Sequence, residues 1–72
     1  MKLTVGQTEK LLKSNQALSQ LGISMMITRL RKTYAKDSSR AMIQKATDEI
    51  NAFLEKFGVV MEADYKTIIN IT

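Results

Sequence analysis

The chain has 72 residues, a net charge of +4, and no cysteine, histidine or proline. A domain of this size buries only about 60% of the surface that its unfolded chain exposes, and without cysteine it has neither disulfides nor thiolate metal sites. Because the commonest catalytic base is also missing, we expect one small domain over 1–72 that is not an enzyme and uses no cofactor.

The charge is distributed unevenly along the chain. Residues 1–36 hold seven basic residues and one acidic residue, a net charge of +6, whereas residues 37–72 hold four basic and six acidic, a net charge of −2. A basic half of this kind attracts an anionic partner. No apolar run approaches the roughly 20 residues of a membrane span, and no signal-peptide pattern is present, so the sequence predicts a cytoplasmic protein without membrane contact.

Helical structure is predicted somewhere within 7–21, opened by Thr4 or Thr8 as the N-cap. Ser14 lies in the middle of this stretch and favours local hydrogen bonds over helix. One helix over 7–21 and two short helices broken near Ser14 are therefore both open. Gly22 is placed to end the segment as its C′ glycine. One side of the segment carries Leu11, Leu18 and Leu21, and Leu12 falls off that stripe.

Two amphipathic helices are predicted next. One runs over about 24–36 with Ser24 as its N-cap, and the other over 39–57 after a cluster of capping residues at 37–39. Each places its apolar residues in one arc of the helix surface. Phe53→Ala is expected to cost about 3–5 kcal/mol. The predicted buried set is Leu18, Leu21, Ile23, Ile27, Leu30, Met42, Ala46, Ile50, Phe53 and Phe57.

The end of the chain changes character, because β-branched and aromatic residues dominate 59–71. One interpretation is a hairpin of two strands, 59–62 and 65–71; a single strand or a short final helix are the others. We expect this tail to be ordered, with Ile69 and Ile71 against the core or a second subunit, because so apolar an edge strand favours a homodimer. The predicted fold class is therefore mostly α, with three to four short helices in a helix-turn-helix-like arrangement and a short C-terminal β-hairpin or strand.

The stretch NQALSQLGISMMITRLR, residues 15–31, resembles the helix-turn-helix of small transcriptional regulators of phages and mobile elements. A short helix ending in Leu21, the turn glycine Gly22 and a basic amphipathic helix carry the resemblance. The resemblance implies that the second helix enters the major groove of double-stranded DNA. An ordinary corner between two helices is the alternative. A second arrangement is a winged helix, since helix 39–57 precedes the predicted hairpin.

The second predicted helix carries the candidate binding residues. Arg29, Lys32 and Lys36 lie opposite its apolar stripe with Met25 among them, and Arg31 lies beyond the other edge of the stripe. Basic residues on one helix face supply phosphate contacts, and an exposed methionine suits a thymine methyl group or a protein surface. The candidate set for binding DNA or a protein partner is Met25, Thr28, Arg29, Arg31, Lys32 and Lys36.

Two functions follow from this face of the helix. The first is a small DNA-binding or transcription-regulating protein. The alternative is a protein-interaction module, such as an antirepressor or inhibitor, which binds an acidic protein surface and masks its partner. A charged face that meets only solvent is the simplest interpretation of the same pattern.

Overall fold

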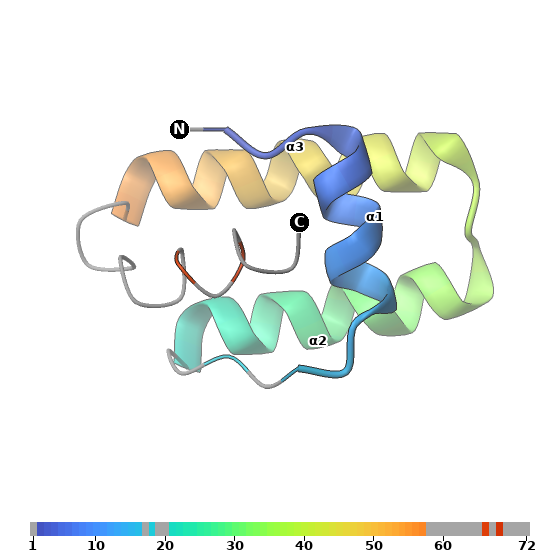
Figure 1. Cartoon of the computed structure of the whole chain (residues 1–72), viewed down its shortest axis with the longest axis horizontal. Coiled ribbons are helices and arrows are strands. Elements are labelled where there is room, and N and C mark those ends of the chain that lie inside the picture. Colours follow the sequence, from blue (N-terminus) through green and yellow to red (C-terminus); the bar gives the residue numbers. More distant parts are fainter. Residues whose placement is uncertain (1, 17, 19–20, 58–65, 67, 69–72) are drawn as a thin grey trace.

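The computed structural model describes residues 2–16, 18, 21–57, 66 and 68 (Figure 1). Three helices form this part of the chain: α1 (Val5–Lys13), α2 (Leu21–Lys36) and α3 (Arg40–Phe57). Helices α2 and α3 run in opposite directions along the long axis of the molecule, and α1 crosses both (Figure 1). The predicted mostly helical fold is confirmed. None of the described helices has the length and apolar character that crossing a membrane requires.

Helix α1 begins with a capping box at Thr4. The Thr4 hydroxyl accepts a hydrogen bond from the Gln7 amide at 3.1 Å, and the Gln7 side chain accepts one from the Thr4 amide at 2.9 Å. The helix ends at Lys13 because Ser14 has extended backbone. Of the two predicted N-caps, Thr4 is therefore confirmed, as is the break near Ser14. The single helix over 7–21 is wrong, and of the two short helices the described residues form only the first. Residues 14–16 and 18 are not helical.

Helix α2 begins earlier than predicted, at Leu21. Gly22 is consequently its second residue and does not end a preceding helix. Ser24 is not an N-cap either, since its hydroxyl donates to the Leu18 carbonyl at 2.7 Å from within the helix. The extra turn brings Ile23, which is fully buried, onto the same apolar face as Ile27. The turn that a helix-turn-helix over 15–31 requires at Gly22 is therefore not formed.

Helix α3 starts one residue after its predicted first residue. The Ser39 hydroxyl caps it by accepting a hydrogen bond from the Met42 amide at 3.2 Å. The Asp37 carboxylate accepts the Ser39 amide at 3.0 Å. Hydrogen bonding by the Ser39 side chain, and then by this amide, lowers the pKa of that carboxyl. Because only residues 37–39 connect α2 to α3, the two helices are antiparallel neighbours.

One apolar core joins the three helices to Leu3 and Ile68. Of the predicted buried set, Ile23, Ile27, Leu30, Met42, Ala46 and Ile50 are buried. Leu18 and Phe53 are only half-buried, and Phe57 is wrong, since it is 38% exposed. The Leu21 side chain lies outside the described residues. Leu11, Ile43 and Leu54, which the sequence places on apolar helix faces, are also buried, whereas the burial of Leu3, Leu12 and Ile68 was not predicted.

The predicted C-terminal hairpin or strand is not confirmed. Two residues of the tail belong to the described part of the chain, Lys66 and Ile68, and both have helical backbone. Ile68 is 1% exposed and belongs to the core. The rest of the predicted strands, Ile69 and Ile71 included, lies outside the described residues.

Asn51 of α3 holds the segment that precedes α1. Its amide oxygen accepts the Leu3 amide at 2.7 Å, and its amide nitrogen donates to the Leu3 carbonyl at 3.0 Å. Leu3 is 3% exposed, so these bonds fix a buried residue. We expect Asn51→Ala to lower the free energy of unfolding by about 1–2 kcal/mol, because two hydrogen bonds disappear together.

Urea denaturation followed by circular dichroism measures this change, and amide exchange at Leu3 reports the local loss. Gln44→Ala is the matched control, because Gln44 is exposed on the same helix and bonds only Asp48, four residues on, at 3.1 Å among the described contacts. Equal effects of the two variants would contradict a special role for Asn51.

Candidate binding surface on α2

Five of the six predicted site residues lie on one exposed face of α2. Met25 is 64% exposed, the Arg29 side chain is 69% exposed, and the other three are exposed as well. The sixteen residues of α2 include four basic residues and no acidic one. A shallow hollow of about 340 Å³ lies along this face near Met25 and Arg29. We call the face formed by Met25, Thr28, Arg29, Lys32 and Lys36 the α2 outer face.

Arg31, the sixth predicted residue, does not belong to this face. It is half-buried, and its guanidinium donates through Nε and Nη2 to the Leu11 carbonyl, both at 3.3 Å, and through Nη2 to the Gln16 carbonyl at 3.2 Å. Burial lowers the pKa of this guanidinium, which nonetheless stays protonated in proteins. Arg31 therefore ties the end of α1 and the following segment to α2.

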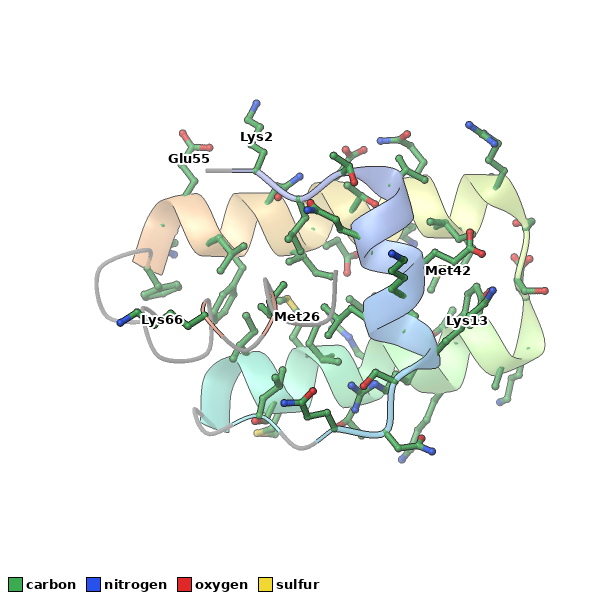
Figure 2. All side chains as sticks on the ribbon, viewed as in Figure 1. Lys2, Lys13, Met26, Met42, Glu55 and Lys66 are labelled. Carbon is green, nitrogen blue, oxygen red and sulfur yellow. The ribbon has the colours of Figure 1, made fainter. Side chains whose placement is uncertain are left out.

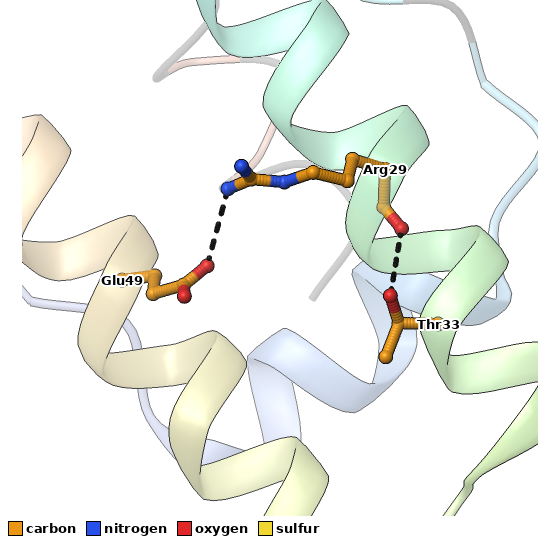
Figure 3. Close-up of polar contacts among 3 residues, drawn as sticks. All are labelled: Arg29, Thr33 and Glu49. Carbon is orange, nitrogen blue, oxygen red and sulfur yellow. Dashed lines mark hydrogen bonds and ion pairs between the residues drawn. The ribbon is translucent and has the colours of Figure 1, made fainter.

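Arg29 reaches the neighbouring helix as well as solvent (Figure 3). Its Nη2 lies 3.4 Å from Oε2 of Glu49, whose side chain is 36% exposed. Exposed pairs of this kind contribute only about 0–1 kcal/mol, so Glu49 holds Arg29 weakly. The backbone carbonyl of Arg29 also accepts a hydrogen bond from the Thr33 hydroxyl at 3.2 Å. Sequence reasoning missed the pair because the two residues lie on different helices.

The Thr28 hydroxyl is not free to donate a hydrogen bond to a partner. Its hydroxyl donates to the Ser24 carbonyl at 2.8 Å, one turn back in the helix. The hydroxyl proton is therefore engaged, and Thr28 presents its methyl group and its oxygen lone pairs to the surface. Thr28 can therefore contact an apolar group or accept a hydrogen bond from a partner, but it has no free proton to donate to one.

Apolar side chains border the α2 outer face on the side of α3. A second hollow, of about 390 Å³, is lined by Met25, Met26, Arg29 and Phe53. The Phe53 and Phe57 rings pack with their centroids 4.8 Å apart, and Nζ of Lys56 lies 5.3 Å from the Phe57 centroid. The sequence assigned both rings to the core, so this apolar edge was not predicted.

The edge of α3 that faces away from α2 carries charged side chains of both signs. Met26 points from α2 into the space between α2 and α3, whereas Glu55 and Lys2 extend away from α2 (Figure 2). Glu55 and Asp48 lie on that far edge together with the N-terminal segment. This far edge therefore carries two carboxylates together with Lys2, whereas α2 itself has no acidic residue.

In the described part of the chain, no group of carboxylates is arranged to hold a metal ion. No family model, no curated protein and no solved structure matches the sequence.

Proposed function

We propose that this chain is a small DNA-binding protein of the transcription-regulating kind, which binds double-stranded DNA through the α2 outer face. The observation that carries the proposal is an exposed helix face with three cations on a helix that has no acidic residue. Cations on one helix face contact phosphates, which supply most of the affinity of a protein for DNA. The proposal does not depend on a helix-turn-helix.

The cations and the apolar groups of the α2 outer face contact different parts of the duplex. Arg29, Lys32 and Lys36 contact phosphates and orient α2 on the duplex. Met25 and the Thr28 methyl group, exposed among these cations, contact thymine methyl groups in the major groove, which is wide enough to admit one helix. Glu49 is displaced from Arg29 on binding, at small cost because the pair is long and exposed.

The test is a titration of the protein with mixed-sequence duplex DNA at low and at moderate salt. The triple variant Arg29→Ala/Lys32→Ala/Lys36→Ala should stay folded, since surface substitutions usually change stability by less than about 0.5 kcal/mol each. It should lose affinity for all duplexes alike, and the slope of log K against log salt should fall by about 0.9 per lost contact.

A second triple variant, Lys2→Ala/Lys13→Ala/Arg40→Ala, removes the same charge from other parts of the surface. It should retain the affinity and most of the salt slope of the wild type. Absence of duplex binding by the wild type at low salt would rule out the proposal. Equal losses in the two triple variants would show that net charge, rather than the α2 outer face, governs binding.

A further inference from the structure

Arg29 lines three neighbouring hollows on the surface. The first lies along the α2 outer face, and the second lies between α2 and α3 beside Phe53. The third, of about 250 Å³, continues between the same helices at Leu30 and Met42. The three hollows adjoin one another at Arg29, whose side chain reaches across to Glu49 of α3. We call the three adjoining hollows together the α2–α3 groove, and its principal lining residues are Met25, Met26, Arg29, Met42, Lys45 and Phe53.

The walls of the groove are apolar and adaptable. They include three methionines, Met25, Met26 and Met42, together with the half-buried ring of Phe53. Methionine is unbranched and polarisable, and it is frequent on surfaces that accept apolar side chains of varied shape. A sugar–phosphate backbone has no side chains with which to fill such hollows, whereas a peptide does.

The rim of the groove is basic. Arg29 and Lys32 lie on its α2 side, and Lys45 lies on its α3 side. Glu49 is the one acidic residue among those that line the three hollows, and Arg29 pairs with it. The complementary surface therefore has an apolar centre and carboxylates at its edges.

We infer that the α2–α3 groove docks an acidic amphipathic helix of a protein partner. Such a helix lays apolar side chains at positions i, i+3, i+4 and i+7 into a groove, and its flanking Asp or Glu residues meet Arg29, Lys32 and Lys45. The inference does not rest on DNA binding. The two surfaces share Met25 and Arg29, so an acidic helix in the groove and a duplex on the α2 outer face exclude each other.

The probe is a displayed library of helical peptides with leucine fixed at i, i+4 and i+7 and with Glu, Lys, Gln or Ser varied elsewhere. Selection on the whole chain should enrich Glu over Lys among the recovered peptides. Recovered peptides, made synthetically, should bind Met25→Ser and Arg29→Gln about tenfold more weakly than the wild type, a loss typical of central interface residues. Met25 and Arg29 are exposed, so both variants should keep the melting curve of the wild type.

Arg40→Gln is the matched control, because it removes one positive charge from an exposed residue that lines none of the three hollows. It should bind the recovered peptides as the wild type does. A library that yields no binders, or binders without acidic bias, would overturn the inference, as would equal losses in Arg40→Gln and Arg29→Gln. Self-association through Met25 in sedimentation would assign the groove to a second copy. Loss of duplex binding alone would assign these residues to DNA.

Discussion

Replacing Ile50 with alanine should lower the free energy of unfolding by about 2–5 kcal/mol, the range typical of a buried isoleucine. Ile50 is fully buried in the middle of α3, within the core that joins all three helices. Its side chain has no route to solvent, so truncation leaves a cavity as well as lost apolar contact. Native proteins are stable by only about 5–15 kcal/mol, so the variant should be largely or partly unfolded at physiological temperature.

Urea denaturation followed by far-ultraviolet circular dichroism measures the loss. Met25→Ala is the control, because Met25 is 64% exposed and the change should stay within about 0.5 kcal/mol. Phe53→Ala should now cost less than the about 3–5 kcal/mol expected of a buried ring, since Phe53 is only half-buried. A midpoint for Ile50→Ala equal to that of the wild type would disprove the core assignment.

Arg31→Ala should cost about 1.5–3 kcal/mol, which is the range for hydrogen bonds made by a charged group. The change removes three N–H donors from the Leu11 and Gln16 carbonyls. Arg31→Lys should recover only part of the loss, because an ammonium does not reproduce the planar guanidinium fork. Amide exchange should quicken at the end of α1 before it quickens in α3.

Arg29→Ala is the comparison, since it removes the same side chain from an exposed position on the same helix. It should change stability by less than about 1 kcal/mol. Equal stabilities of Arg31→Ala and Arg29→Ala would show that the hydrogen bonds of Arg31 do not stabilise the fold. Arg31 would then again be a candidate binding residue, as the sequence predicted.

The sequence predicted α3 best, because a strong apolar period and a capping serine agree there. It predicted α1 less well because this helix crosses both others. Leu11 and Leu12 are both buried, whereas a search for one apolar stripe accepts Leu11 and leaves Leu12 outside. At α2 the predicted burial of Ile23 is confirmed, but the helix start at Leu21 was not predicted, because the local preferences of Gly22 and Ser24 favour a later start.

For the candidate site, the sequence predicted which residues share an exposed face, but not which residues contact other elements. Periodicity alone placed Met25, Lys32 and Lys36 on an exposed face, and the structure agrees. It could not show that Arg31 bonds two backbone carbonyls, or that Glu49 lies beside Arg29, because these contacts join residues 15 to 20 positions apart. Apolar periodicity shows which face of a helix a side chain lies on, but it does not show whether another element packs over that face. Phe57 was for this reason predicted to be buried, although it is exposed.

The core that joins Leu3 to Ile68 bears on how the chain folds as it is synthesised. A nascent chain leaves the ribosome from its N-terminus at roughly 5–20 residues per second. Leu3, α1 and α2 emerge before α3 supplies Asn51 and before Ile68 reaches the core. Because short isolated helices are marginal in water, folding of this core is completed only after α3 and Ile68 have left the ribosome. During that interval the apolar stripes of α1 and α2 are open to chaperones and to neighbouring nascent chains.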